Sequence, residues 1–303
     1  MRRERGVAAI TAVLIVAVAA SAAAVMLAQQ SAMIDQAAMV AARAQADLYA
    51  QAGVDWARGV LAEDFRQGKD VDTLAEGWAR PIAALPVERA IVSGNIADEQ
   101  GRFNLNNVVR QGQKSDADLR VLRSLLGSLD LPPDLADAVL DWIDTDADLS
   151  GAAGAEDAYY LSLPRPYRAA NREMVQVEEL YRVRGFDAKA VERLKPHVTA
   201  LPGRTAINAN TASEAVVAAV FGIAREKAAA GLAERRTRPF RTAAEVAERL
   251  KEQAPPAETL DVKSRHFNVR VTVSQDDVQL ASEALVRRED TGATAIVWRR
   301  PRY

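Results

Sequence analysis

The chain begins with MRRERG at residues 1–6 and continues with VAAITAVLIVAVAASAAAVMLA at residues 7–28. No charged residue lies between Val7 and Ile34, and Asp35 is the first charge after the apolar run. About 20 apolar helical residues span the hydrocarbon core of a bilayer, so this run predicts a transmembrane helix. Three arginines precede the run, and the positive-inside rule therefore predicts a cytoplasmic N-terminus with the bulk of the chain outside.

A cleaved secretory signal has a similar pattern, with a basic start, an apolar stretch and small residues such as Ala22 and Ala24 for cleavage. Two features argue against it. Gly6 stands at the border between the charges and the apolar run, where a different peptidase could cut. Helical spacing also continues without a break to about Gly68. Apolar residues recur every four positions on one face of this continuation, at Ala44, Leu48, Ala52, Trp56 and Val60.

The composition excludes several classes of site. The 303 residues include 39 basic and 41 acidic side chains, two histidines and no cysteine. Without cysteine there are no disulfides, thiolate nucleophiles or cysteine-ligated zinc and iron–sulfur clusters. A net charge of −2 gives no general attraction to nucleic acid. Neither His197 nor His266 stands in a catalytic motif and no nucleophile–base pattern is present, so we expect the chain not to be an enzyme.

Hydrophobic periodicity beyond the first helix predicts strands at both ends and helices between them. The segment 68–86 reads as a connector with a short helical piece. Alternation predicts strands at Val87–Ile96, Arg102–Val109, His266–Ser274, Val278–Arg287 and Ala293–Trp298. Helical spacing fills the block between them, with Ser115 and Thr242 in capping-box patterns. So few strands favour one antiparallel sheet with an all-helical domain inserted into it.

Carboxylates gather between Asp134 and Asp157, where no basic residue occurs. Packed carboxylates repel one another, and Asp144, Asp146 and Asp148 have the alternating spacing of calcium loops. The match to an EF-hand is incomplete, because its sixth position is leucine and its twelfth is alanine. A solvated acidic loop, or carboxylates near helix N-termini, is the alternative. The candidate calcium ligands are Asp144, Asp146, Asp148, Glu156 and Asp157, with one ion or two and a structural role.

A second pattern, within residues 205–250, resembles helix–hairpin–helix modules, which bind DNA phosphate through a two-glycine hairpin. The first hairpin keeps Gly222 but has Ala224 at the second glycine position, and in a similar segment Gly185 is followed by phenylalanine and Asp187. Arg235, Arg236, Arg238 and Arg241 form a basic cluster nearby. We favour a packing module without DNA. The alternative is a membrane-anchored periplasmic helix–hairpin–helix protein that binds DNA, of the DNA-uptake type.

A short basic leader that ends in glycine, followed by a hydrophobic helix that continues into an amphipathic half, resembles the type IV pilins and pseudopilins. The resemblance implies that a prepilin peptidase cleaves after Gly6 and that Val7 becomes the N-methylated first residue. Most members carry glutamate where this chain has Thr11. That glutamate neutralises the terminal amine of a neighbouring subunit inside the membrane, where an unpaired charge is costly. Thr11 cannot do so, which suits a subunit at the end of a filament.

This substitution, the inserted helical block and the segment 154–160 together resemble the general secretion pathway protein K family of type II secretion system minor pseudopilins. The resemblance implies an α+β fold, in which an N-terminal transmembrane and amphipathic long helix precedes a small antiparallel pseudopilin sheet with a large inserted all-helical domain. It also implies calcium in the helical domain. The corresponding boundaries are 1–6 for the leader, 7–66 for the helix, 67–112 and 263–303 for the sheet domain, and 113–262 for the insertion.

The same resemblance implies a function and a set of partners. The chain would cap the tip of the periplasmic pseudopilus, help to initiate its assembly and support protein secretion across the outer membrane. Its partners would be other minor pseudopilins in a tip complex, the major pseudopilin, the inner-membrane secretion platform and prepilin peptidase, with no nucleic acid. It would be a single-pass protein of the inner membrane of a Gram-negative bacterium, with its bulk in the periplasm.

Overall fold

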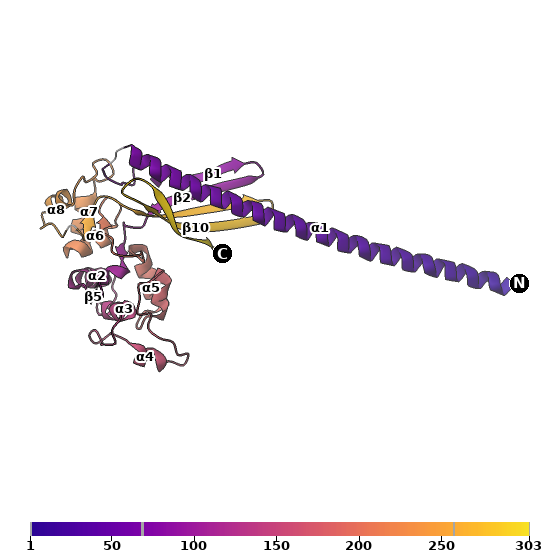
Figure 1. The fold of residues 1–303 in the computed structure, drawn as a ribbon, viewed down its shortest axis with the longest axis horizontal. Helices are drawn as coiled ribbons and strands as arrows, with labels where there is room; N and C mark the ends of the chain where they lie inside the picture. The colour runs from indigo at the N-terminus through magenta and orange to yellow at the C-terminus, as the bar shows by residue number, and fades with distance from the viewer. Residues whose placement is uncertain (1, 68–69, 257, 303) are drawn as a thin grey trace.

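A computed structural model of the chain describes residues 2–67, 70–256 and 258–302. Helix α1 (Arg2–Arg66) has 65 residues, which corresponds to a length of about 100 Å. Its N-terminal half extends away from the rest of the molecule, whereas its C-terminal half lies along a sheet (Figure 1). The long N-terminal helix and the α+β class predicted from the sequence are both confirmed.

The C-terminal half of α1 packs on the sheet through a face of small and aliphatic side chains. Ala46, Ala50, Val54, Ala57 and Leu61 are buried at spacings of three and four residues. They share a core with inward-facing residues of the sheet such as Phe267 and Val271. This is not the face marked by the four-residue repeat in the sequence: of that set, Leu48 and Trp56 stay 64% and 55% exposed. A second apolar face of α1 therefore remains outside the core.

Five antiparallel strands form the sheet, in the order β1-β2-β9-β10-β11. The strands are β1 (Ile82–Val87), β2 (Ala90–Asp98), β9 (His266–Gln275), β10 (Val278–Arg288) and β11 (Thr294–Arg302). Strands β2 and β9 pair along their whole length although the insertion separates them in the sequence. The antiparallel sheet and the three strands predicted at the C-terminal end are confirmed.

Two predictions near the start of the sheet were wrong: one strand was missed, and one predicted strand is mainly a turn. All of strand β1 except Val87 lies in the predicted connector, where Pro86 and a register irregularity weaken the alternation. The segment 102–109 is mainly a 3₁₀ turn, η2 (Leu105–Val108), after the two-residue strand β3 (Phe103–Asn104). The Asn104 side chain accepts a hydrogen bond from the Asn106 amide at 3.2 Å, which stabilises the turn instead of a strand.

The insertion has its own hydrophobic core, separate from the core between α1 and the sheet. Its helices are α2 (Asp116–Ser128), α3 (Leu135–Ile143), α4 (Asp157–Leu161), α5 (Ala188–Leu194), α6 (Glu214–Phe221), α7 (Arg225–Leu232) and α8 (Ala243–Leu250), with 3₁₀ turns η3 (Val177–Arg182) and η4 (Lys195–His197). Ser115 and Thr242 cap α2 and α8 as predicted. Short strands also occur: β3 pairs with β6 (Val198–Thr199), β4 (Val109–Arg110) with β5 (Gln113–Lys114), and β7 (Ile207–Asn208) with β8 (Leu260–Asp261).

Two glycines of α1 provide a matched test of how closely the helix approaches the sheet. A Cβ atom at Gly53 would lie 2.9 Å from Val271 Cγ1, whereas at Gly59 it would have no neighbour within 4 Å. Gly53→Ala is expected to lower the free energy of unfolding by about 1–3 kcal/mol, because the buried, β-branched Val271 cannot move away freely. Gly59→Ala should instead raise it by about 0.5–1 kcal/mol through helix propensity. Denaturant unfolding of the two variants measures both, and the same sign for both would contradict this packing.

Candidate functional site

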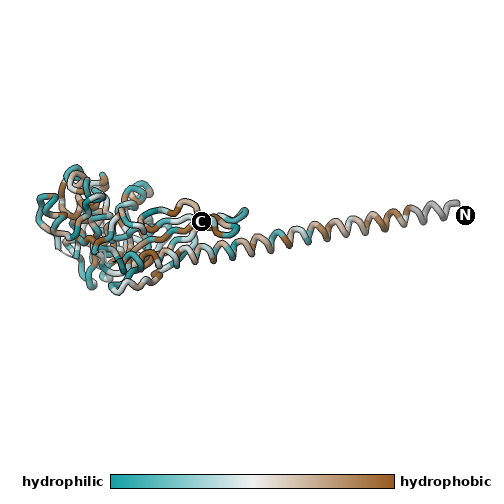
Figure 2. The backbone as a smooth tube through the Cα atoms, turned by 90° about the horizontal axis from the view of Figure 1, so that it is seen from above, coloured by the Kyte–Doolittle hydropathy of each residue, from teal (hydrophilic) through white to brown (hydrophobic). Residues whose placement is uncertain are grey.

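The exposed half of α1 is the first candidate site. Figure 2 shows apolar residues along much of this half, and large apolar side chains such as Ile10, Leu14 and Val18 are 63–71% exposed. The helix is long and apolar enough to cross a membrane, and none of its most apolar window is buried within the molecule. Thr11 is exposed on it. The predicted processing residues Gly6 and Val7 lie in α1, but their side chains are outside the described part of the structure.

The second candidate is the acidic loop that follows α3. Asp144 ends this helix and Glu156 precedes α4, and both side chains are buried together with Asp141, one turn earlier in α3. Their charges interact, because Asp141 and Asp146 raise the pKa of Asp144 and of Glu156 beyond the effect of burial. The structure therefore gathers two predicted ligands, Asp144 and Glu156, around Asp141, with Asp146 exposed beside them.

Burial, with smaller contributions from neighbouring carboxylates, raises the pKa of Asp144 and of Glu156 to about 7 each. Asp144 Oδ1 and Glu156 Oε1 are buried and accept no hydrogen bond from the described residues. Buried acceptors without a donor are costly, and carboxylate oxygens are the ligands that calcium prefers. The donor set and the two unpartnered oxygens thus fit a hard divalent cation.

The other predicted ligands are placed differently. Asp157 Oδ1 accepts a hydrogen bond from the Ala169 amide at 3.0 Å, and Oδ2 pairs with Arg168 at 3.3 Å. Asp148 is exposed, and its amide donates to Asp146 Oδ1 at 2.9 Å. The sequence interpretation omitted Asp141 from its ligands, although its place one helical turn before Asp144 puts both carboxylates on one side of the chain. Asp141 accepts hydrogen bonds from the Ser150 amide, which closes the loop over it.

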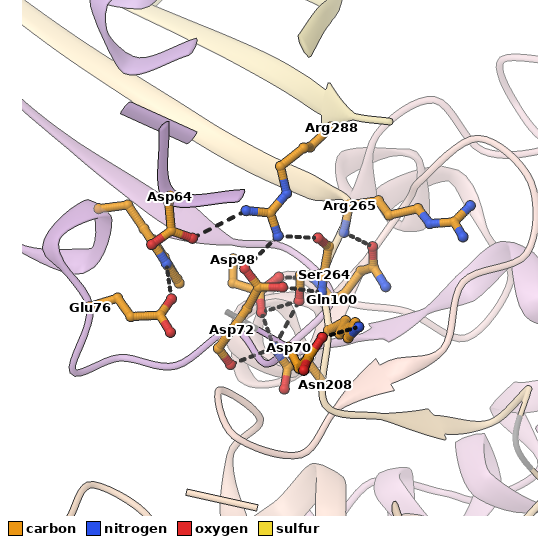
Figure 3. Close-up of polar contacts among 12 residues, drawn as sticks. Asp64, Asp70, Asp72, Glu76, Asp98, Gln100, Asn208, Ser264, Arg265 and Arg288 are labelled. Carbon is orange, nitrogen blue, oxygen red and sulfur yellow. Dashed lines mark hydrogen bonds and ion pairs between the residues drawn. The ribbon is translucent and has the colours of Figure 1, made fainter. Parts of the chain in front are cut away.

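A third cluster joins α1, the sheet and the insertion (Figure 3). Arg288 of β10 is buried and donates to Asp64 Oδ2 at 3.3 Å, to Asp72 Oδ1 at 2.5 Å and to the Ser264 carbonyl at 3.0 Å. Asp64 lies in the last turns of α1, and Asp72 follows that helix. Because the guanidinium bridges both carboxylates, it offsets much of the cost of burying them.

Asp98, at the end of β2, extends this cluster into the insertion. Its Oδ2 atom accepts hydrogen bonds from Asn208 Nδ2 at 3.1 Å, Thr211 Oγ1 at 2.5 Å and Ser264 Oγ at 2.6 Å. Burial raises the pKa of Asp98 to about 6. The Arg288–Asp98 network, comprising Asp64, Asp72, Asp98, Asn208, Thr211, Ser264 and Arg288, thus fixes the insertion to the end of the sheet. These residues are far apart in the sequence, so no local spacing revealed them.

His266, which begins β9 beside this network, gives a pH-dependent test. The ring is 5% exposed, and burial lowers its pKa from 6.5 to about 4. Since the unfolded chain binds a proton more readily, stability present above pH 6.5 is lost as the pH falls toward 4, by about 3 kcal/mol. Between pH 7 and pH 4, the stability of His266→Gln should therefore improve by about 3 kcal/mol relative to the wild-type chain, and the raised pKa values of Asp98, Asp144 and Glu156 act equally in both chains and cancel in this difference. His197→Gln is the comparison: burial also lowers the pKa of His197, but this residue is less buried, so its difference from wild type should be smaller. The same pH dependence in His266→Gln and the wild-type chain would refute the assignment.

The helix–hairpin–helix segment is built into the core of the insertion. Helix α6 ends at Gly222, which is left-handed with φ 65°, and α7 follows. Arg235 of the basic cluster donates to the carbonyls of Ala209 and Ala212 at 3.1 and 2.5 Å, which gives it a packing role. In the second hairpin, Asp187 caps α5 by accepting from the Ala190 amide at 2.7 Å.

A helix with one bare apolar half and one half packed on a small antiparallel sheet is the architecture of the pseudopilins. The comparisons with known proteins give the family within this class. Residues 101–203 and 207–267 match two family models, both described as type II secretion system (T2SS), protein K. The chain belongs to the type II secretion system protein K family.

Individual relatives agree with this assignment. The chain is 31% identical to type II secretion system protein K of Aeromonas hydrophila, over 95% of each chain. It is 38% identical to the protein K of Pseudomonas aeruginosa, over 74% of this chain and 70% of the relative. Among solved structures, it matches the GspK-GspI-GspJ complex from the enterotoxigenic Escherichia coli type 2 secretion system, with a TM-score of 0.76 and 25% identity over 86% of this chain and 97% of the matched chain. The chain is thus a minor pseudopilin, and the long apolar α1 is consistent with anchoring in the inner membrane.

Proposed function

We propose that this chain caps the tip of the periplasmic pseudopilus of a type II secretion system and helps to initiate its assembly. One observation carries the proposal: the insertion lies at the end of the molecule opposite the N-terminus of α1 (Figure 1). In a filament whose helices point back to the membrane, that end faces away from the membrane. A bulky domain there blocks the stacking of a further subunit, and Thr11 in place of the usual glutamate is consistent with a terminal position.

The matched structure suggests partners for this chain in the tip complex. The matched structure is a GspK-GspI-GspJ complex, which supports a tip complex of this chain with two other minor pseudopilins. Such a complex would start the filament on the inner-membrane secretion platform and sit above the major pseudopilin. A strain that lacks this chain should therefore assemble few pseudopili and retain its secreted proteins in the periplasm, and the chain supplied in trans should restore both. Normal secretion without the chain would overturn the proposal.

Processing of the leader gives a direct chemical prediction. We expect prepilin peptidase to cleave after Gly6 and the new terminus at Val7 to be methylated, with α1 spanning the inner membrane from a cytoplasmic N-terminus. Mass spectrometry of the chain from its native membrane should find N-methylated Val7. Substituting Gly6 with a bulky residue should leave the whole leader in place, because the peptidase must accommodate the residue before the cut. A mature end near Ala24 would instead indicate an ordinary secretory signal.

Calcium is the proposed structural cofactor of the insertion. Asp144 and Glu156 would hold the ion through their unpartnered buried oxygens, with Asp141 and Asp146 beside them and Asp148 and Asp157 at the edge of the loop. When bound, calcium supplies positive charge that offsets the repulsion among these carboxylates. The chain's own residues order the loop around the ion, and in this way metal binding adds to the folding free energy of the domain.

A further inference from the structure

Residues 70–79, between α1 and β1, form a segment that we call the strap. Three of its side chains, Asp72, Glu76 and Trp78, are only 2–8% exposed. Trp78 packs edge-on against Phe267 of β9, with the ring centroids 5.3 Å apart, and belongs to the core between α1 and the sheet. The strap therefore covers part of that core.

The strap is also bound to the insertion, through Asp72. The Asp72 amide donates to the Val262 carbonyl at 2.9 Å, and its carbonyl accepts from Asn208 Nδ2 at 3.0 Å. Its Oδ2 atom accepts from the Ser264 amide at 2.7 Å. A movement of the strap away from α1 would therefore release contacts of the insertion as well.

Buried charges around the strap do not balance (Figure 3). Among the described residues Arg288 is the only buried lysine or arginine, and it faces four buried carboxylates, those of Asp64, Asp72, Glu76 and Asp98. The first two share Arg288, and Asp98 accepts hydrogen bonds from three side chains. Glu76 has no cationic partner within the described part of the chain, and its Oε2 atom accepts from Trp78 Nε1 at 2.6 Å.

Glu76 also lies close to two of the other carboxylates. One of its oxygens is within 4.8 Å of an oxygen of Asp64 and of an oxygen of Asp72. Ionised carboxylates repel one another at this distance, and burial by itself disfavours the charged form. Burial raises the pKa of Glu76 above its usual 4.5, and the charges of Asp64 and Asp72 raise it further. In the closed strap Glu76 therefore binds a proton more tightly than it would in solvent.

The charged groups on the neighbouring segments do not cancel this effect. Lys263 pairs with Asp70 at 3.5 Å and Arg265 pairs with Asp290 at 2.9 Å, and all four side chains are more than half exposed. Solvent screens such pairs from the buried cluster. Burial lowers the pKa of His266 to about 4, so this ring adds no positive charge at mildly acidic pH.

We propose that the strap is a pH-sensitive device, in which Glu76 carries a proton while the strap is closed on α1 and ionises when the strap opens. Protonated Glu76 is neutral beside Asp64 and Asp72, whereas ionised Glu76 is repelled by both and regains solvent when the strap moves away. Closure is therefore favoured at low pH and weakens as the pH rises through the pKa of Glu76 in the closed strap. The hold on the insertion thus responds to the pH around it, a regulatory property beyond the proposed role at the filament tip.

Titration of the full chain in detergent micelles measures this proton directly. In a chain labelled with ¹³C at the glutamate side-chain carboxyl groups, the NMR signal that disappears in Glu76→Gln belongs to Glu76. It should titrate with a midpoint above 4.5, because burial and two neighbouring charges disfavour ionisation. A midpoint at or below 4.5 would overturn the proposal.

Opening of the strap can be measured by thiol labelling, because the natural chain contains no cysteine. Thr73 is 6% exposed, so Thr73→Cys should react with dithiodipyridine only when the strap opens. At about pH 8 this variant should react faster than the same variant carrying Glu76→Gln, by a factor of about ten for each pH unit between the NMR midpoint and 4.5. The ratio of the two rates, in which the thiolate fraction cancels, should fall toward one as the pH approaches 4.5.

Leu74 provides the control, because this residue of the strap is 44% exposed and accessible without opening. Leu74→Cys should react at the same rate with and without Glu76→Gln. Equal rates for Thr73→Cys in the two backgrounds at about pH 8 would overturn the proposal. Should Thr73→Cys fail to fold, thermal unfolding gives the same test: Glu76→Gln should gain stability relative to the wild-type chain as the pH rises, and a constant difference would equally overturn it.

Discussion

Replacement of Arg288 with methionine is expected to lower the free energy of unfolding by about 3–5 kcal/mol. The guanidinium is buried between Asp64 and Asp72, at 3.3 and 2.5 Å. Methionine fills a similar volume but leaves two buried carboxylates without their cation. Burial already raises the pKa of Asp72 despite the attraction of Arg288. Removing Arg288 would therefore raise this pKa further and make the charged form of the buried carboxylate more costly. Denaturant unfolding of the full chain in detergent micelles measures the loss.

A matched control separates burial from charge. Arg265 pairs with Asp290 at 2.9 Å, but both side chains are more than half exposed, so Arg265→Met should change stability by less than about 0.5 kcal/mol. Adding Asp64→Asn and Asp72→Asn to Arg288→Met should recover part of the loss, because the uncompensated charges are then removed. Equal effects of Arg288→Met and Arg265→Met would show that the Arg288–Asp98 network does not hold the insertion to the sheet.

Calcium is expected to stabilise the wild-type chain by about 2.7 kcal/mol when its concentration is 100 times the dissociation constant. The double variant Asp144→Asn, Glu156→Gln should lose this gain, because amides provide neither the charge nor the paired oxygens of carboxylates. In the presence of a calcium chelator the order of stability should reverse, and the double variant should be at least as stable as the wild type. The reason is that two buried groups that repel their neighbours have become neutral.

Thermal unfolding with calcium and with chelator measures both effects. The control variant, Asp277→Asn with Glu234→Gln, makes the same chemical changes at exposed positions outside the loop and should keep the calcium response of the wild type. A wild-type chain that does not respond to calcium would reject the site. A response that persists in the double variant would place the ion elsewhere.

Much of the fold could be predicted because apolar residues recur at regular intervals along its main helix and strands. The apolar run and the four-residue repeat identify α1, and the alternation of Phe267, Val269, Val271 and Val273 identifies β9. Strand β1 was missed because it is short and irregular, follows Pro81 directly and contains Pro86. Asn104 and Asn106 resembled the polar side of a strand, but their side chains and that of Asn107 are buried and hydrogen-bond to distant loops.

The candidate sites also differ in how far the sequence alone could predict them. Asp144 and Glu156 could be singled out because local clustering of acids marks a cation loop, whereas the contribution of Asp141 depends on how α3 faces that loop. The spacing of residues in the sequence could not predict the Arg288–Asp98 network, because its members come from α1, β2, β10 and the insertion and meet only in the folded chain. Periodicity also identified the apolar face with Leu48 and Trp56, but it could not show that these side chains stay exposed instead of packing on the sheet.

The position of the chain in the filament is the most direct test of its role. Pseudopili sheared from cells that overproduce the major pseudopilin can be labelled with gold-conjugated antibodies against this chain and viewed by electron microscopy. A cap at the tip predicts label at a single end of each filament, the end farthest from the membrane. Label distributed along the shaft would contradict the account, because the insertion at the far end of α1 could not then be preventing further stacking.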